Sequence, residues 1–310
     1  MNLFDHLKDD AVFLAGAWRA LRGAAPIAKN PTMVFPRLLE TLAARYGDNP
    51  ALISDVETLT YRGLAARANR YARWALAQGL AKGDTVCLLM PNRPEYMAIW
   101  LGITHAGGAV ALLNTNLTGP SLAHCVDIVT PRHVIVADTL APALASAMPH
   151  LRSEPQIWTH GGGVVAARRI DRIVEALGSD PLADSERPAL TTEDRALFIY
   201  TSGTTGMPKA ANVNHYRVML ASLGFAGVMA TRPTDRMYDC LPMYHTAGGL
   251  AAVCSLLING GSVVIREKFS VRDFWDDIAR HDCTIFQYVG ELCRYLVNAP
   301  SQNCDGALTR

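Results

Sequence analysis

The chain has 310 residues, and half of them are hydrophobic, so it can bury a substantial core. Its 29 basic and 28 acidic residues leave a formal net charge of +1 (29 − 28), and no basic run predicts a nucleic-acid partner. A membrane-spanning helix needs roughly 18 or more consecutive apolar residues, whereas the longest apolar stretches here are interrupted by Gly, His or Asn.

Residues 1–30 are predicted to form an amino-terminal helical extension. Acidic and basic residues are mixed through residues 3–22, without the basic start, apolar centre and cleavage site of a signal peptide. The apolar side chains expected along one side of this helix are Leu3, Phe4, Leu7, Phe13, Leu14, Trp18 and Leu21. We expect that side to pack on the protein body in preference to a membrane surface.

The segment from residue 35 to residue 137 alternates between helical and strand patterns. Apolar residues recur at helical spacing in residues 35–46 and 61–78. Beyond them, the predicted strands are 85–90, 109–113 and 133–137, with helices at 94–107 and 121–129. This alternation favours a largely parallel sheet covered by helices, an α/β fold. Three histidines on or beside these elements have no partners at ligand spacing, and we interpret them as structural: His105, His124 and His133.

The second half continues the alternation after a polar surface connection at residues 179–195. The predicted strands are 196–200, 237–241, 262–266 and 284–288, and the predicted helices are 214–230, 246–258, one that includes residues 274–275, and one that ends at residue 298. Asn214 is expected to cap the first of these helices, and Ser270 with Asp273 forms a capping-box pattern before the third.

The cysteines are scattered, odd in number and mostly inside apolar segments, and no Cys-x-x-Cys occurs. They are Cys87, Cys125, Cys240, Cys254, Cys283, Cys293 and Cys304. This pattern is typical of reduced thiols in a cytosolic protein and not of a disulfide framework or a zinc site. We therefore predict a cytoplasmic protein without a metal site built from its own side chains.

The stretch 200–209, Tyr-Thr-Ser-Gly-Thr-Thr-Gly-Met-Pro-Lys, has the composition of a loop that holds phosphate. Its two glycines permit tight turns, its hydroxyls and backbone N–H groups donate to phosphate oxygens, and its lysine adds a positive charge. The residues concerned are Thr201, Ser202, Gly203, Thr204, Thr205, Gly206 and Lys209. A strand before the loop and a helix after it is a context that suits anion binding.

Two other interpretations of this stretch are possible. The stretch is not a Walker P-loop, because its glycines are too close together and Lys209 is followed by Ala210, which disfavours a P-loop kinase or NTPase. A bare Gly-Thr-Thr-Gly is as often a connection without a ligand. The full string, in which Pro208 stiffens the approach to Lys209, is far more specific.

The full string resembles the signature of the adenylate-forming superfamily, which includes acyl-CoA synthetases, luciferases and peptide-synthetase adenylation domains. In that superfamily the loop holds the β- and γ-phosphates of ATP. Most members have Gly after the lysine, whereas the Ala-Ala-Asn-Val here, at residues 210–213, is similar to the fatty-acid transport protein type, which acts on long and very long acyl chains. The resemblance implies layered, largely parallel sheets with covering helices and assigns residues 31–310 to the AMP-binding amino-terminal domain.

Three further strings carry the resemblance. Residues 241–249, Leu-Pro-Met-Tyr-His-Thr-Ala-Gly-Gly, match a superfamily motif that places His245 beside the acyl pocket; on spacing alone, a histidine that caps a helix is the alternative. Residues 288–296, beginning Tyr-Val-Gly-Glu, resemble a segment that lines the acyl tunnel, which implicates Tyr288, Gly290 and Glu291. A strand-to-helix turn with a carboxylate in the first helical turn would also account for that segment. Residues 114–125 resemble the same subfamily.

The resemblance implies a two-step reaction. A fatty-acid carboxylate attacks ATP to give an acyl-adenylate and pyrophosphate, and coenzyme A then displaces AMP. Lys209 and His245 are the expected catalytic residues, and Mg²⁺ would bridge phosphate oxygens. The expected partners are a fatty acid and ATP, with no nucleic acid, while a homodimer and a peripheral membrane contact both stay open.

The chain departs from the family in length, because it is roughly half as long as most members. The Tyr-Gly-x-Thr-Glu and Thr-Gly-Asp motifs, the hinge and the carboxy-terminal domain with its lysine are absent from it. We therefore expect a truncated amino-terminal portion with impaired activity, an unfinished sheet edge and exposed apolar surface. A non-catalytic nucleotide- or acyl-binding remnant is the alternative, and a ligase for a medium-chain, carnitine-like or aryl carboxylate is another.

Overall fold

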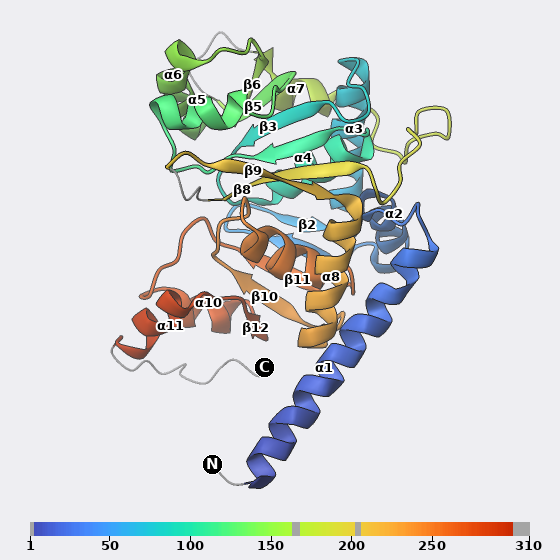
Figure 1. The fold of residues 1–310 in the computed structure, drawn as a ribbon, viewed down its shortest axis with the longest axis vertical. Coiled ribbons are helices and arrows are strands. Elements are labelled where there is room, and N and C mark those ends of the chain that lie inside the picture. The colour runs from blue at the N-terminus through green and yellow to red at the C-terminus, as the bar shows by residue number, and fades with distance from the viewer. Residues whose placement is uncertain (1–2, 163–167, 202–205, 300–310) are drawn as a thin grey trace.

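The computed structural model describes residues 3–162, 168–201 and 206–299. Within those ranges one sheet has seven strands, in the order β7 (Arg168–Arg169), β6 (Gln156–His160), β5 (His133–Ala137), β3 (Thr85–Leu89), β4 (Ala109–Leu112), β8 (Arg195–Thr201) and β9 (Lys209–Asn214). Neighbouring strands are parallel except for the antiparallel pair β8 and β9 at one edge. The expected parallel sheet is confirmed (Figure 1).

A second sheet of five described strands has the order β12 (Ile285–Phe286), β10 (Arg236–Asp239), β11 (Ser262–Ile265), β1 (Pro50–Ile53) and β2 (Thr58–Thr60). Only β1 and β2 are antiparallel. Strand β11 returns to pair with β1, which is far away in the sequence. The amino-terminal part of the chain and the part after the phosphate-loop string therefore build one sheet together.

Helices cover both sheets, as expected. They are α2 (Phe35–Tyr46), α3 (Tyr61–Ala77), α4 (Pro94–His105), α5 (Gly119–Asp127), α6 (Ala141–Ala147), α7 (Ile170–Glu175), α8 (His215–Met229), α9 (Ser255–Leu257), α10 (Phe274–Arg280) and α11 (Gly290–Val297), with short 3₁₀ turns η1 (Asp138–Leu140) and η2 (Met148–His150). The helix predicted at 246–258 is instead a π-helix, η3 (Ala247–Cys254), followed by α9. The predicted cap at Asn214 is confirmed, because its side chain accepts from the Arg217 N–H. At Ser270 the predicted contact with the Asp273 N–H forms in the turn before α10, but the N-cap of α10 is Asp273, which makes no side-chain cap hydrogen bond.

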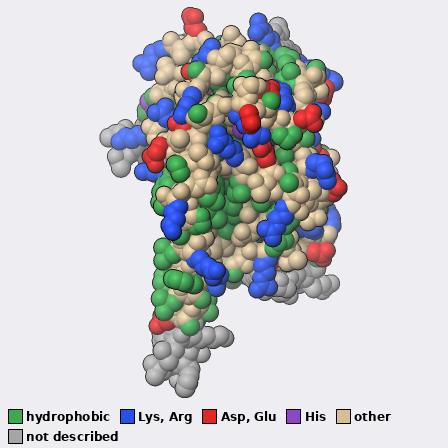
Figure 2. Space-filling view, turned by 90° about the vertical axis from the view of Figure 1, so that its right-hand side faces the viewer, with side chains coloured by type: hydrophobic (Ala, Val, Ile, Leu, Met, Phe, Trp, Pro, Cys, Tyr) green, Lys and Arg blue, Asp and Glu red, His purple; other side chains and the backbone are tan. Residues whose placement is uncertain are grey.

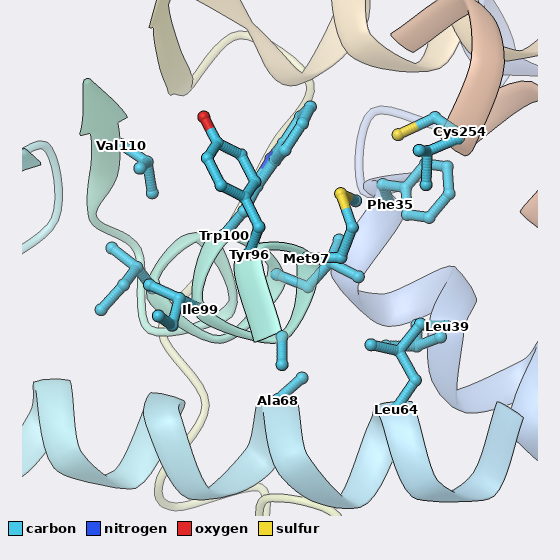
Figure 3. Close-up of a cluster of buried hydrophobic side chains, with 14 of the residues drawn as sticks. Phe35, Leu39, Leu64, Ala68, Tyr96, Met97, Ile99, Trp100, Val110 and Cys254 are labelled. Carbon is cyan, nitrogen blue, oxygen red and sulfur yellow. The ribbon is translucent and has the colours of Figure 1, made fainter. Parts of the chain in front are cut away.

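Helix α4 forms the centre of the main core. Every residue of α4 is buried, because the helix is covered on several sides at once. Figure 3 shows its Met97 and Trp100 among side chains that come from α2, α3, β4 and η3. At Gly102 the backbone of α4 approaches α3 so closely that a Cβ would lie 2.5 Å from the Ala68 carbonyl oxygen. The absent side chain is what allows the two helices to pack.

The first helix, α1 (Leu3–Lys29), packs along α8 and extends beyond the rest of the protein (Figure 1). The expected helix is confirmed, but the face expected to pack is wrong within residues 10–29, the part of α1 whose side chains the structure describes. Gly16, Gly23 and Ala20 face α8, whereas Leu14 and Trp18 are 64% and 65% exposed. Small residues let two helix backbones approach closely, and this contact wins over the larger apolar side chains.

In the part of the chain that the structure describes, no helix combines the length and the hydropathy of a membrane span. Figure 2 shows hydrophobic side chains along the protruding part of α1. Within residues 10–29 of α1, the large apolar side chains that are exposed are Val12, Phe13, Leu14, Trp18 and Leu21. The neighbouring α8 adds Leu220, Phe225 and Val228. We call these eight residues the α1/α8 apolar surface.

The contact between α1 and α8 makes a prediction about glycine. A Cβ at Gly227 would lie 2.5 Å from the backbone of Ala20, whereas one at Gly224, on the same helix, would meet nothing within 4 Å. We expect Gly227→Ala to weaken the docking of α1 by about 1–3 kcal/mol, because backbone atoms must move apart. Trypsin should then cleave faster after Arg19 and Arg22.

Gly224→Ala is the matched control for this prediction. It should leave cleavage unchanged or slow it, because Ala is favoured over Gly inside a helix by up to about 1 kcal/mol. Equal cleavage rates for the two variants would contradict the proposed close packing.

Candidate functional site

The phosphate-loop string lies at the turn end of a β-hairpin made of β8 and β9. We call this end, where Thr201 and residues 206–209 flank the turn, the hairpin mouth. Strands β8 and β9 pair in antiparallel register, with Thr201 opposite Lys209 and Tyr200 opposite Ala210. Gly206 has φ +107°, a backbone conformation that side chains rarely adopt. The string's remaining hydroxyls and its first glycine, at positions 202–205, lie outside the described residues.

The expected order of strand, loop and helix is wrong at this point. Strand β9 lies between the loop and α8, so the amino terminus of α8 is at the opposite end of the hairpin arm from the loop. The dipole of α8 therefore does not support an anion at the loop. Lys209, the basic residue of the string, is exposed at the first position of β9.

A cavity of about 500 Å³ lies beside the mouth of the hairpin. Its volume is within the range of small-molecule sites. Residues that line it come from the ends of β4, β8 and β10 and from the start of β9, namely Asn114, Leu117, Tyr200, Thr201, Pro208, Tyr244 and His245. The structure thus brings Thr201 and His245, both expected from the sequence, to one cavity, and places Lys209 next to the lining residue Pro208.

Two aromatic residues form the wall of the cavity on the side of the second sheet. The rings of Tyr244 and His245 are 4.6 Å apart. Partial burial lowers the pKa of His245 below its usual value, which favours the neutral imidazole. A neutral imidazole can donate or accept a hydrogen bond beside a carboxylate without carrying a fixed charge. Burial raises the pKa of Tyr244, against hydrogen bonds with Thr115 and Asn116 that lower it.

A second cavity, of about 390 Å³, shares Tyr244 with the first. Its other lining residues are Pro91, Asn92, Thr115, Asn116, Thr139, Leu140, Cys240, Pro242, Glu267, Lys268 and Phe269. Asn92 holds the two sheets together here, because its amide donates to the carbonyls of Leu241 and Arg266 and accepts from the Met243 N–H. Tyr244 and residues 114–117 lie between the two cavities.

Tyr288, Gly290 and Glu291 are not among the residues that line either cavity. Tyr288 is 51% exposed and follows β12 at the edge of its sheet. Gly290 begins α11, and Glu291 is paired with Arg294 one turn later. In the described residues the structure does not bring this segment to the cavity that contains His245.

Sequence reasoning missed Asn114, Leu117 and Tyr244 as lining residues. Asn114 and Leu117 lie in residues 114–125, which only a similarity to a subfamily had marked. Tyr244 lies in residues 241–249, the motif that contains His245. Their position in the loops that follow β4 and β10 was the available signal, since ligands of parallel sheets bind at the carboxyl ends of strands. In the described residues, no group of three or more His, Cys, Asp and Glu side chains gathers at metal-binding distance.

Comparison with known proteins decides the family. The family model described as AMP-binding enzyme matches residues 39–308. The chain belongs to this family. Long-chain fatty acid transport protein 1 of Rattus norvegicus is 35% identical over 279 residues, which cover 87% of this chain and 43% of that protein. The medium/long-chain-fatty-acid–CoA ligase FadD6 of Mycobacterium tuberculosis is 33% identical over 97% of this chain and 49% of its own length.

Solved structures have the same fold. A putative long-chain-fatty-acid CoA ligase from Rhodopseudomonas palustris superposes with a TM-score of 0.80 at 21% identity, covering 89% of this chain and 68% of that one. An anthranilate CoA ligase in complex with anthranoyl-AMP has a TM-score of 0.78 at 22% identity, covering 85% of this chain and 50% of that one. The chain spans about half the length of the curated relatives it matches.

Proposed function

We propose that this AMP-binding chain contributes to the ATP-dependent activation of a long-chain fatty acid, first to an acyl-adenylate and then to acyl-CoA. The observation that carries the proposal is the cavity that joins the hairpin mouth, with Thr201 and the adjacent Pro208–Lys209, to Tyr244 and His245. Relatives named as fatty acid transport proteins and as a medium/long-chain-fatty-acid–CoA ligase support the acyl substrate.

In this proposal the hairpin mouth holds the triphosphate. Backbone N–H groups, hydroxyls and the Lys209 ammonium neutralise phosphate charge and keep the reacting atoms in line. The residues assigned to this role are Thr201, Ser202, Gly203, Thr204, Thr205, Gly206 and Lys209. Mg²⁺ would be held by the phosphate oxygens of ATP and would supply further neutralisation. Exposed Lys209 and the hydroxyl of Thr201 fit an anion at this place.

The acyl group would occupy the opposite side of the cavity. His245, favoured as the neutral imidazole, would border the carboxylate, which it can contact without trapping it in an ion pair. The acyl chain would extend beyond the first cavity and contact Tyr288, Gly290 and Glu291. The similarity of their string to an acyl-tunnel segment supports this role. Coenzyme A is the proposed acceptor in the second step.

Two further properties of this chain are the class of acid that it accepts and how much of the reaction it completes alone. We propose a long-chain acid over a medium-chain, carnitine-like or aryl one, because fatty acids are the substrates in the names of the relatives at 33–35% identity. Because the chain spans about half of those relatives, we propose that nucleotide binding is retained and that turnover by this chain alone is impaired. A non-catalytic binding remnant is the competing proposal.

We also propose that the α1/α8 apolar surface contacts an anionic lipid surface. Residues 10–29 of α1 and helix α8 contain four basic side chains, Arg19, Arg22, Lys29 and Arg217, and one acidic side chain, Asp10. Exposed Phe, Leu and Trp beside an excess of basic residues is the composition of a helix that lies in the membrane interface. A fatty acid dissolved in lipid would then reach the protein without crossing water.

Replacing Lys209 tests the nucleotide site. We expect Lys209→Ala to weaken ATP binding about 10- to 100-fold, because a hydrogen bond to a charged group contributes about 1.5–3 kcal/mol. Titration calorimetry with Mg-ATP would measure it, with Lys29→Ala, an exposed lysine on α1, as the control. Unchanged affinity in Lys209→Ala would refute the assignment. ATP–pyrophosphate exchange with oleate, octanoate and benzoate would then separate a ligase from a binding remnant and rank the acids.

Replacing Trp18 tests the lipid contact. We expect the protein to sediment with phosphatidylcholine vesicles that contain phosphatidylglycerol, and less so at high salt. Trp18→Glu should reduce binding roughly tenfold or more, because burying an aromatic side chain contributes about 1.5–3 kcal/mol. Val56→Glu, at an exposed site in the turn between β1 and β2, should bind normally. A dimer that dissociates on Trp18→Glu, without vesicle binding, would indicate a second copy of the chain instead.

A further inference from the structure

Helix α5 holds the hairpin on both sides of its mouth. The Tyr200 hydroxyl, on β8, donates to the Cys125 carbonyl at 2.5 Å. The His124 Nε2 lies 3.0 Å from the Pro208 carbonyl, directly before β9. His124 and Cys125 are consecutive residues of α5. Two neighbouring positions of one helix therefore contact both strands at the point where they separate.

The chemistry of both contacts determines which group is the donor. A carbonyl oxygen only accepts, so the proton of the second bond is on His124 Nε2, as it is in the neutral Nε2–H tautomer and in the imidazolium. Burial raises the pKa of Tyr200, which keeps the phenol protonated as a donor. The Cys125 carbonyl is among the last four of α5, which have no partner inside the helix. The Tyr200 hydroxyl thus supplies a donor to the Cys125 carbonyl near the end of α5, and the same hydrogen bond holds Tyr200 in place.

Helix α5 is a rigid base for these bonds. Its Leu122 and Cys125 are fully buried, and they belong to the same apolar cluster as Phe198 and Tyr200 of β8. On the other side of the mouth, Lys209 follows Pro208 directly and pairs with Thr201 across the hairpin. The backbone of Lys209 is therefore fixed from two directions, by the Pro208 anchor and by the strand pair.

We propose that His124 is a positioning residue for the nucleotide site: its hydrogen bond to the Pro208 carbonyl sets where Pro208 and Lys209 meet the phosphates of a bound nucleoside triphosphate. This inference rests on the proposed function of the hairpin mouth. His124 does not need to touch the ligand. Binding groups must be held within about 0.5 Å of their productive position. Pro208 lines the cavity, and the hydrogen bond from His124 of α5 holds its backbone in place.

Two substitutions at position 124 test the proposal with Mg-ATP as the probe. His124→Phe keeps a ring of similar size and removes the donor, and it should raise the dissociation constant for ATP about 3- to 10-fold, the worth of one hydrogen bond. His124→Gln places an amide N–H near the former Nε2 and should restore affinity to within about twofold of the unsubstituted chain. If Gln binds as weakly as Phe, the hydrogen bond is not the cause and the proposal is overturned.

Hydrogen exchange without nucleotide separates this inference from the proposed function. In His124→Phe, amides in the peptide 206–214 should exchange several-fold faster, while peptides from β3 and α4 should not change. If the unsubstituted chain does not bind ATP but this local loosening occurs, the proposed function fails and the anchor stands as a structural one only, which overturns the positioning role. If neither affinity nor local exchange changes, the anchor itself is refuted.

Tyr200→Phe supplies an independent variant if His124→Phe does not fold. It removes the other bond to α5 while keeping the buried ring, and the same local loosening and a similar loss of ATP affinity are expected. Normal affinity and normal exchange in Tyr200→Phe would overturn the proposal, because α5 would then not hold the hairpin mouth.

Discussion

The site depends on the direction of the strands that surround it. In a parallel sheet all carboxyl ends lie at one edge, where ligands bind. Strands β4 and β8 are parallel neighbours, so Asn114, two residues after β4, and Thr201, the last residue of β8, line the same cavity. Tyr244 and His245 follow β10 of the second sheet and reach the same cavity. The cavity therefore results from where three strands end, before any particular side chain contributes.

Sequence patterns predicted the elements that bury apolar surface. The strands at residues 85–89 and 133–137 are buried at every position, and their continuous apolar runs were visible in the sequence. A helix start that depends on a local hydrogen bond was also predictable, at Asn214. Grouping Thr201 with His245 was another matter. It came from a resemblance between strings, because nothing in the spacing of two distant segments says that they share a cavity.

Strand β9 and the packed face of α1 were missed because they carry weak apolar signals. Residues 209–214 of β9 are mostly exposed or half-buried, so no period-two pattern marks them as a strand, and pairing with β8 decides their structure. The packed face of α1 consists of Gly16, Ala20 and Gly23, which a hydrophobicity pattern ignores in favour of Leu14 and Trp18. Both errors have one cause: backbone proximity, and not side-chain hydrophobicity, stabilises these contacts.

A binding loop built from hydroxyls and glycines has little apolar surface of its own with which to offset the entropy of ordering. Its supports must therefore come from its flanks. Here the flanks are Tyr200 on β8 and Pro208 before β9, and each is bonded to α5, which is itself packed in the core. The two ends of the loop are therefore ordered when the protein folds, and ligand binding does not have to offset the entropy of ordering them. The residues between the flanks can keep a composition that serves the ligand alone.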